Sequence, residues 1–331
     1  MGLSFDDSDV QAFLDRVRAA DGRSPDGPPD PAESVVCAER DAATGELAAL
    51  AWRPVPGNGA TADPAELYVD PRFRGRGIGR RLAAQLLSEP GGIWAHSTLP
   101  AAAHLAAELG ATPTRELLQL RRSLATADFG PQPDPIPHLV APQGFSIRTF
   151  QPGADDAEFL RVNAAAFTWH PEQGRFDQHD LEAHMSEPWF DADGFFLAVP
   201  SDDLALSGGV APSGGAALSG GVALSGGVAP GDNAPGDGAP RGTILGFHWT
   251  KVHPAGTDDA AAIGEIYVLA VDPASPVRHL GGALTAAGLK HLASKGLSQV
   301  MLYVESDNAA ALKLYHRFGF TEHIRDTVFS R

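Results

Sequence analysis

One phrase occurs twice in this chain of 331 residues, each time where an apolar strand passes through a turn into a helix. The first copy, residues 69–83, is VDPRFRGRGIGRRLA, and the second copy, residues 271–285, is VDPASPVRHLGGALT. The same succession of predicted strands and helices surrounds both copies. A repeated unit that carries its own apolar pattern folds once per copy. The sequence therefore predicts two similar α/β domains in tandem.

Apolar periodicity predicts the same order of elements in the two halves. In the first half we expect helices over 8–20, 79–88 and 101–110, and strands over 33–40, 46–54, 65–70, 92–98 and 115–124. In the second half we expect helices over 155–167, 282–294 and 308–319, and strands over 145–150, 194–199, 243–253, 264–272, 298–305 and 322–330. The expected fold class is α/β, with a mixed central sheet flanked by helices in each domain.

Two segments of low complexity interrupt the repeat. A Pro-rich passage over 127–144 indicates a linker between a domain of residues 1–126 and a domain of residues 145–331. Within the second domain, residues 204–238 repeat Gly, Ala, Ser and Pro, a composition that buries too little apolar surface to order itself. We expect this segment to be a flexible insertion without a function of its own.

Charge and cysteine content exclude several classes of protein. The formal net charge of -16 argues against nucleic-acid binding, and the single cysteine excludes an intramolecular disulfide and a cysteine-rich metal site. The N-terminal residues lack the basic and apolar regions of a signal peptide, and no apolar run approaches the length of about 18 residues that a membrane helix needs. We therefore expect a cytoplasmic monomer that binds neither nucleic acid nor membrane.

The first turn, RGRGIGR at residues 74–80, has the composition of a phosphate-binding loop. Its glycines allow close approach of the backbone, and the following helix directs its N-terminal amides at the ligand. A Walker loop is excluded because no Gly-Lys-Ser/Thr follows, and Arg80 replaces the last glycine of a GxGxxG motif. A glycine-rich turn surrounded by solvated arginines is the alternative.

The spacing of Arg74, Gly77 and Gly79 resembles the acetyl-CoA pyrophosphate loop of the GNAT acetyltransferases. The segment 308–320, NAAALKLYHRFGF, is similar to the helix of that fold that carries a tyrosine near the CoA sulfur. Longer passages of the second half, HPEQG, WFDADGFFLA, LGFHWTKVH, GEIYVLAVDP and LYVESDNAAALKLY, resemble the mycothiol synthase family of tandem GNAT proteins. The resemblance spans most of the second half and is looser in the first.

This resemblance implies acetyl transfer from acetyl-CoA to the cysteinyl amine of cysteinyl-glucosaminyl-inositol, a small thiol pseudo-disaccharide. By position, the residues implied to hold that acceptor are Glu172, Lys251, Glu265 and Tyr303. The residues implied to lie along acetyl-CoA in the second half are Leu269, Ala270, Val271, Pro276, Val277, Arg278, His279, Leu280, Gly281, Gly282, Asn308, Ala309, Ala310, Ala311, Leu312 and Lys313. A second acetyl-CoA is implied in the first half, along Leu67, Tyr68, Val69, Gly75, Arg76, Gly77, Ile78, Gly79 and Arg80.

Amide formation requires a base that deprotonates the amine and an acid that protonates the leaving thiolate. When the halves are aligned on their Asp-Pro and Leu-Gly/Phe-Gly pairs, the second half offers Glu265 and Tyr315. The first half offers Asp63 and Ala106 at the same places, and alanine has no acidic group. We therefore expect catalysis in the second half, with Glu265 as base, acting through water, and Tyr315 as acid.

Other interpretations of these residues stay open. Glu265 and Lys251 could be solvated strand residues, and Tyr315 could pack its ring on the sheet. His170, His248 and His253 suggest a metal, but they lack HExxH spacing and cysteine partners, so we expect none. The chain could also bind acetyl-CoA without catalysis, or acetylate another amine, such as a protein N-terminus or an aminoglycoside.

The second turn departs from the phosphate-loop pattern at three positions, Pro276, Val277 and His279. Proline has no N–H to donate, and histidine carries a Cβ where glycine allows close approach or a positive φ. We therefore expect acetyl-CoA to bind at this turn through the remaining amides, and more weakly than at an intact loop.

Overall fold

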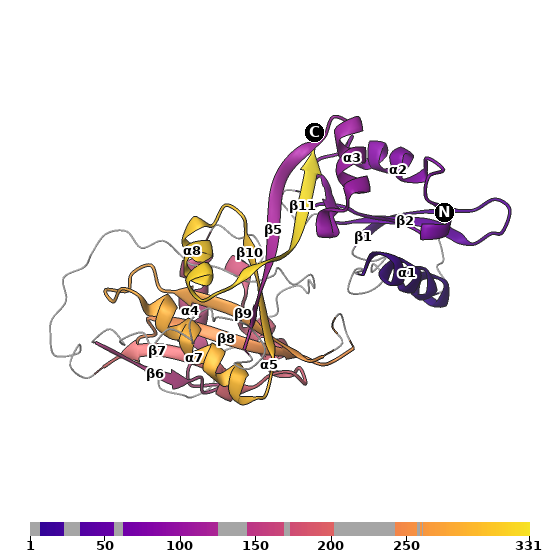
Figure 1. Ribbon diagram of the computed structural model, residues 1–331. Coiled ribbons are helices and arrows are strands. Elements are labelled where there is room, and N and C mark those ends of the chain that lie inside the picture. The colour runs from indigo at the N-terminus through magenta and orange to yellow at the C-terminus, as the bar shows by residue number, and fades with distance from the viewer. Residues whose placement is uncertain are drawn as a thin grey trace. The chain divides into compact units, whose positions relative to one another are not determined.

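The computed structural model describes residues 7–22, 34–55, 62–124, 144–168, 173–201, 242–256, 259 and 261–331 (Figure 1). The predicted insertion and all of the predicted linker except its last residue lie outside this part of the chain. Backbone contacts divide the chain into two compact units. The first unit comprises Met1–Leu117 and Ile324–Arg331, and the second comprises Leu118–His323.

The first unit begins with helix α1 (Asp7–Asp21) and an antiparallel sheet of β1 (Ser34–Arg40), β2 (Leu47–Pro54) and β3 (Glu66–Val69). Val10, Phe13, Leu14 and Val17 form one face of α1, because residues three and four apart align on a helix, and this face packs with Leu50 of β2. The 3-10 turn η1 (Pro71–Phe73), helix α2 (Ile78–Leu86), strand β4 (Ile93–Ala95), the 3-10 turn η2 (His96–Thr98) and helix α3 (Pro100–Glu108) follow.

Strands β5 (Thr112–Ser123) and β11 (Thr321–Ser330) contribute residues to both units. In the first unit, the end of β11 pairs antiparallel with β4, with Thr327 opposite Ala95 and Phe329 opposite Ile93. The last strand of the chain therefore pairs with a strand from the first half of the sequence. The domain limits expected from the sequence, 1–126 and 145–331, stay a prediction.

The second unit contains the longer sheet, with strands in the order β6-β7-β8-β9-β10-β5. Its elements before the second turn are β6 (Phe145–Thr149), α4 (Asp156–Ala166), η3 (Gln173–Arg175), α5 (Gln178–Met185), η4 (Ala192–Gly194), β7 (Phe195–Pro200), β8 (Gly246–His253) and β9 (Ile263–Val271). After it come α7 (Leu280–Ser294), β10 (Gln299–Glu305) and α8 (Ala309–Arg317). Helix α5 was not expected from the sequence.

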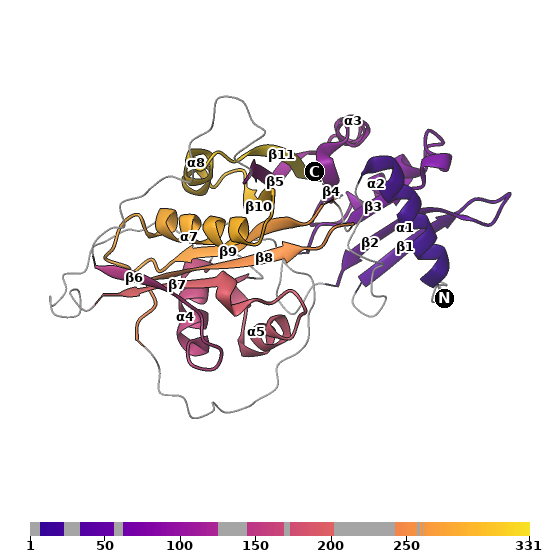
Figure 2. The same cartoon turned by 60° about the horizontal axis from the view of Figure 1, so that its bottom comes forward.

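Helices cover both faces of this sheet, with α7 on one face and α4 and α5 on the other (Figure 2). Helix α7 is apolar on nearly all sides and packs with α8 in one core cluster, whereas α4 and α5 pack in a second, aromatic cluster. Gly288 of α7 lies against β8, where an added Cβ would be 2.1 Å from the His248 ring. Only glycine therefore fits at this helix–strand contact.

The two units repeat a specific ion pair next to their turns. In the first unit, Nε of Arg16 on α1 lies 2.7 Å from Oδ2 of the buried Asp70, which follows β3. In the second unit, Nη2 of Arg161 on α4 lies 2.6 Å from Oδ2 of the buried Asp272, which follows β9. A helix arginine thus holds the aspartate of each Asp-Pro pair in place. This shared contact supports the structural equivalence of the two turns.

Candidate active site

Strands β9 and β10 pair over a short length and then part. Their parallel pairing places Val300 opposite Gly264 and Met301 opposite Glu265, and it does not extend along the rest of the described strands. On the other side of β9, the register with β8 shifts between Trp249 and Thr250, which leaves Tyr267 as an extra residue. Bulges of this kind redirect side chains and are frequent beside active sites. The described pairing of β9 with β10 ends at Glu265 and Met301, beside this bulge.

Glu265 is almost fully buried, with 3% of its surface exposed, although it is a carboxylate. Its Oε2 atom lies 2.7 Å from Nε2 of His253 on β8. Side chains alternate along a strand, so Glu265 shares a face with Tyr267, which packs in the aromatic cluster of α4 and α5. Glu265 is therefore not the solvated strand residue of the alternative interpretation. A buried carboxylate with a fixed hydrogen-bond partner is suited to proton transfer.

Lys251 is the residue of β8 directly opposite Glu265. Its Nζ atom lies 4.6 Å from the ring centroid of Trp189 and 5.1 Å from that of Tyr267. Cation–π contacts of this length hold an ammonium group in place without neutralising its charge. Lys251 is therefore a fixed, half-buried cation on the same face as Glu265.

Tyr303 of β10 belongs to a hydrogen-bonded row that crosses to β5. Its hydroxyl oxygen accepts a hydrogen bond of 2.7 Å from Nε2 of Gln119. Nε of Arg121 donates to Oε1 of the same glutamine at 2.7 Å, and its guanidinium pairs with Asp259. The amide orientation of Gln119 is therefore fixed, and with it the position of the Tyr303 hydroxyl.

Tyr315 of α8 is fully buried in the cluster of α7 and α8, on the opposite face of the sheet from Glu265. Its ring packs against Phe320, yet its hydroxyl has no hydrogen-bond partner among the described residues. Burial raises the pKa of this phenol, so it stays protonated at neutral pH. No hydrogen bond joins it to Glu265. The two groups therefore lie on opposite faces of the sheet.

The turn before α7 keeps the backbone of a glycine turn without the glycine. His279 caps α7 with φ 66° and ψ 14°, and Gly77 caps α2 with φ 78° and ψ 2°. Neither cap carries a side-chain hydrogen bond to the helix amides. The N–H of Val277 is engaged at 3.3 Å by Oγ of Ser275, and Pro276 has no N–H. Fewer amides are therefore available at the second turn than the phosphate-loop pattern would supply.

The arginines around the first turn are all paired with carboxylates. Arg74 makes a bidentate contact of 2.7–2.8 Å with Asp21, and Arg72 contacts Asp70 and Glu46. The other pairs are Arg76 with Asp41, Arg80 with Glu108 and Arg81 with Glu39. The alternative interpretation expected solvated arginines at this turn, and the structure shows them in half-exposed ion pairs. An anion that binds at this turn would compete with the paired carboxylates for the arginines.

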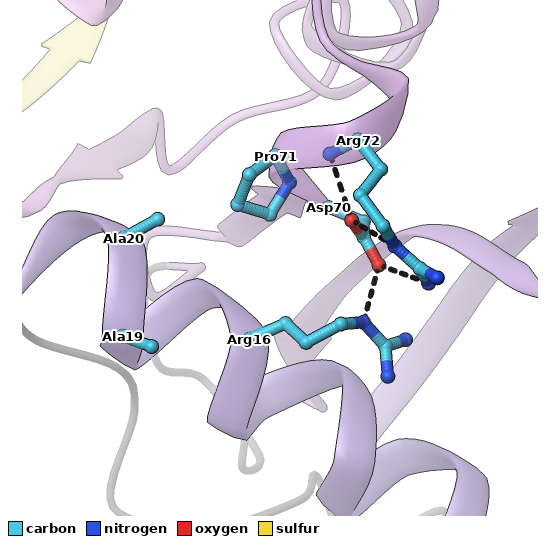
Figure 3. A pocket seen from close by; sticks show the side chains of 6 residues that line it. All are labelled: Arg16, Ala19, Ala20, Asp70, Pro71 and Arg72. Atoms are coloured by element: carbon cyan, nitrogen blue, oxygen red, sulfur yellow. Dashed lines mark hydrogen bonds and ion pairs between the residues drawn. The ribbon is translucent and has the colours of Figure 1, made fainter.

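A cavity of about 300 Å³ lies in the first unit beside this turn (Figure 3). Its lining residues are Arg16, Ala19, Ala20, Asp70, Pro71 and Arg72. Burial alone would raise the pKa of Asp70, but hydrogen bonds from Arg72 and Arg16 lower it to about 2. The carboxylate is fully engaged, and no residue expected to take part in catalysis lines the cavity.

The remaining predicted residues lie as follows. The residues implied to contact acetyl-CoA occupy β3, the first turn and the start of α2 in the first unit, and the end of β9, the second turn and the starts of α7 and α8 in the second. Glu172 and His170 lie outside the described residues. His248 is buried beneath α7, with Nδ1 2.7 Å from the Leu284 oxygen, and burial lowers its pKa to about 4. Among the described residues no group of three potential ligands could hold a metal ion, and no described helix could cross a membrane.

Four contact residues of this region were not identified from the sequence: Trp189, Tyr267, Gln119 and His253. The spacing of Lys251 and His253 was the available signal, because residues two apart on a strand share a face. From the sequence, His253 suggests only a metal ligand. The aromatic partners of Lys251, Trp189 and Tyr267, come from other segments of the chain, so no local sequence pattern predicts these contacts.

The profile described as the acetyltransferase (GNAT) family matches residues 8–110 and, separately, residues 231–320. A protein named mycothiol acetyltransferase from Rhodococcus jostii (strain RHA1) is 42% identical, over 98% of this chain and 94% of its own length. A protein of the same name from Nocardia farcinica (strain IFM 10152) is 40% identical, over 97% of this chain and 92% of its own length.

Solved structures share the fold at low sequence identity. A GCN5-related N-acetyltransferase from Sphaerobacter thermophilus is 20% identical with a TM-score of 0.59, over 97% of this chain and 90% of its own. A tandem GNAT protein from the clavulanic acid biosynthesis pathway is 18% identical with a TM-score of 0.57, over 98% of this chain and 94% of its own. The expected tandem arrangement of two α/β domains is confirmed.

Proposed function

The chain belongs to the GNAT acetyltransferase family and to its mycothiol acetyltransferase group, and from this premise we propose the following reaction. The protein transfers the acetyl group of acetyl-CoA to the cysteinyl amine of cysteinyl-glucosaminyl-inositol, which completes mycothiol. One observation carries the assignment of this chemistry to the second unit. Glu265 is buried beside His253 where the pairing of β9 with β10 ends, and on the other face lies the Tyr315 hydroxyl, which has no hydrogen-bond partner among the described residues.

Glu265 acts as the base in the proposed mechanism. The amine binds as an ammonium ion and loses a proton, through a water molecule, to the Glu265 carboxylate. The free amine then attacks the thioester carbonyl. This role is supported by the burial of Glu265, because a carboxylate shielded from water keeps a fixed geometry toward an incoming cation.

Tyr315 acts as the acid in the proposed mechanism. When the C–S bond breaks, the phenol gives its proton to the departing thiolate, so that CoA leaves as a free thiol, and the second proton that the attacking nitrogen releases restores the phenol. A buried hydroxyl without a partner is unfavourable in the folded chain, and a thiolate would supply the missing acceptor.

The acceptor is proposed to contact Lys251, Tyr303, Glu265 and Glu172. Lys251 and Tyr303 are each held by neighbours, Lys251 over two rings and Tyr303 by Gln119. Fixed polar groups favour binding because little rotational freedom is lost when the ligand arrives. Their hydrogen-bonding groups suit the hydroxyls of a pseudo-disaccharide.

Acetyl-CoA is proposed to lie along the end of β9, residues 269–271, with its phosphates at residues 276–282 and its remaining contacts at 308–313. Support comes from the N-terminus of α7, whose amides carry no side-chain cap. A second acetyl-CoA is proposed in the first unit, at residues 67–69 and 75–80, where Gly77 has the positive φ of a phosphate turn. The first unit is proposed to bind without catalysing, and the limits 1–126 and 145–331 are retained as the proposed domains.

The protein is further proposed to be a cytoplasmic monomer that uses no metal. Two other functions remain as outcomes of the test: binding of acetyl-CoA without turnover, and acetylation of a different amine. Purified protein is incubated with acetyl-CoA and, separately, cysteinyl-glucosaminyl-inositol, an aminoglycoside and a peptide with a free N-terminus. CoA release is followed by chromatography, because the proposed acceptor carries a thiol that a thiol reagent would also detect. CoA release with cysteinyl-glucosaminyl-inositol and with neither of the other two acceptors supports the proposal. CoA release with another acceptor, or no release with any of the three, contradicts it.

A further inference from the structure

His253 is in direct contact with the buried carboxylate of Glu265. Its Nε2 atom lies 2.7 Å from Oε2 of Glu265, and no other hydrogen bond to this carboxylate occurs among the described residues. We propose that His253 is a positioning residue for acetyl transfer: it donates Nε2–H to Oε2 of Glu265 and so leaves Oε1 for the acceptor amine. This inference rests on the proposed function of Glu265 as base.

The contact restricts a side chain that would otherwise have two equivalent oxygens and a free terminal torsion. Rotation about the last bond of glutamate is broad and nearly two-fold. With Oε2 held by the imidazole, rotation breaks a hydrogen bond to a charged group, so a single orientation dominates. A base held in one orientation gains rate because the geometry of proton transfer is set before the amine arrives.

The neighbours of Glu265 do not provide an alternative partner. Lys251 stands directly opposite Glu265, but its ammonium group lies over the rings of Trp189 and Tyr267. Met301 stands on the other side, on β10, and offers no N–H or O–H from its side chain. His253 therefore supplies the hydrogen bond that this part of the chain gives to the carboxylate.

Three substitutions of His253 separate the donor from the shape of the ring. Glutamine carries its amide nitrogen the same number of bonds from Cα as Nε2 of histidine, so His253→Gln keeps a donor at Oε2. His253→Met keeps the length and removes the donor. His253→Asn keeps an amide but is one bond too short to reach. Steady-state kinetics are measured for the acceptor and for acetyl-CoA, with melting temperature and acetyl-CoA affinity as checks of the fold.

We expect kcat to fall about ten-fold or more in His253→Met and His253→Asn, with KM for acetyl-CoA unchanged, and to remain within about three-fold of wild type in His253→Gln. His291→Asn is the matched control, because His291 of α7 also contacts a carboxylate, that of Asp191, at 3.2 Å. The kcat of this variant should equal that of wild type. Equal activity in all three His253 variants, or equal loss in all three, would overturn the proposal. Since wild type must first turn over the acceptor, failure of the proposed function is a separate result.

Discussion

His279 caps helix α7 in the same left-handed backbone conformation in which Gly77 caps helix α2, with φ values of 66° and 78°. Equivalent turns thus share a backbone although only one of them contains glycine. Histidine adopts this conformation at a cost of about 1–2 kcal/mol that glycine avoids. The second turn therefore has the shape of a phosphate loop with fewer N–H groups and added strain.

Restoring the loop pattern should strengthen acetyl-CoA binding in the second unit. The triple change Pro276→Gln, Val277→Gly, His279→Gly returns one N–H and opens space beside the backbone. Each hydrogen bond to a charged group contributes about 1.5–3 kcal/mol, so we expect affinity to rise by about ten-fold or more. Calorimetric titration with acetyl-CoA measures this, alongside KM.

The single change His279→Gly is the control for that experiment. It removes the backbone strain but restores no N–H, so it should raise the melting temperature with little gain in affinity. If the triple variant binds acetyl-CoA no better than wild type, the turn is intact as it stands, and the His279 side chain itself becomes the candidate phosphate contact.

Tyr315→Phe should separate activity from stability. The change removes a hydroxyl that is fully buried and unpartnered among the described residues, so the free energy of unfolding should stay equal or rise by about 1 kcal/mol. Turnover should fall by about 10²–10⁴-fold if the phenol protonates the thiolate. Urea unfolding and steady-state kinetics on the same sample test both statements. Wild-type turnover in this variant would return Tyr315 to a packing role.

The stability of the first unit should depend on the charge of His96. Nε2 of His96 lies 3.0 Å from Glu66, and Nδ1 lies 3.3 Å from the buried Asp326 of β11. Burial alone would lower its pKa, but the Glu66 charge and the hydrogen bonds that the imidazolium donates to both carboxylates raise it to about 9. Because the folded-state pKa exceeds the ordinary value of about 6.5, the stabilisation is complete below pH 6.5 and is lost as pH rises through about 9.

Unfolding free energies at pH 6.5, 8 and 9.5 measure this dependence. Wild type should lose on the order of 3 kcal/mol over this range through His96. His96→Gln keeps hydrogen-bonding capacity but has no proton to lose, so its curve should be flatter. Identical slopes for the two proteins would assign the pH dependence to other groups.

Residues 204–238 should be dispensable. The strands that flank this segment, β7 and β8, are hydrogen-bonded neighbours with Ala198 opposite Gly246, so a short Gly/Ser linker can close the connection. Loop-closure entropy changes slowly with length, and we expect the melting temperature and kcat to remain near wild type. A large fall in either would show that the segment packs against the folded protein.

The repeated features of this chain could be predicted from its sequence, whereas its long-range contacts could not. The alternation around Glu265 and Lys251 predicts strands, and the Asp-Pro pairs align the two turns that the structure caps in the same way. The pairing of Thr327 with Ala95 could not be predicted, because it joins strands from opposite ends of the chain and no local pattern encodes it.

In the candidate site, too, the faces of the strands could be predicted from the sequence and the atomic contacts could not. A strand pattern fixes which face a side chain occupies but not which atoms meet there, so His253 could be placed near Lys251 and not at Oε2 of Glu265. The carboxylate partners of the loop arginines come from α1, β1 and α3 and the connections between strands, which only the folded unit brings to the turn. The described residues offer the Tyr315 hydroxyl no hydrogen-bond partner, and this is also a property of packing, since residue type alone does not determine whether a tyrosine finds an acceptor.

Acetyl transfer in the second unit is proposed to use Glu265 as base. The most direct measurement compares kcat of Glu265→Gln with that of Asp63→Asn, where Asp63 is the residue that aligns with Glu265 when the two Asp-Pro pairs are matched. We predict a loss of about 10²–10⁴-fold in Glu265→Gln, with acetyl-CoA affinity retained, and near-wild-type kcat in Asp63→Asn. Near-wild-type turnover in Glu265→Gln, or a comparable loss in Asp63→Asn, would contradict it.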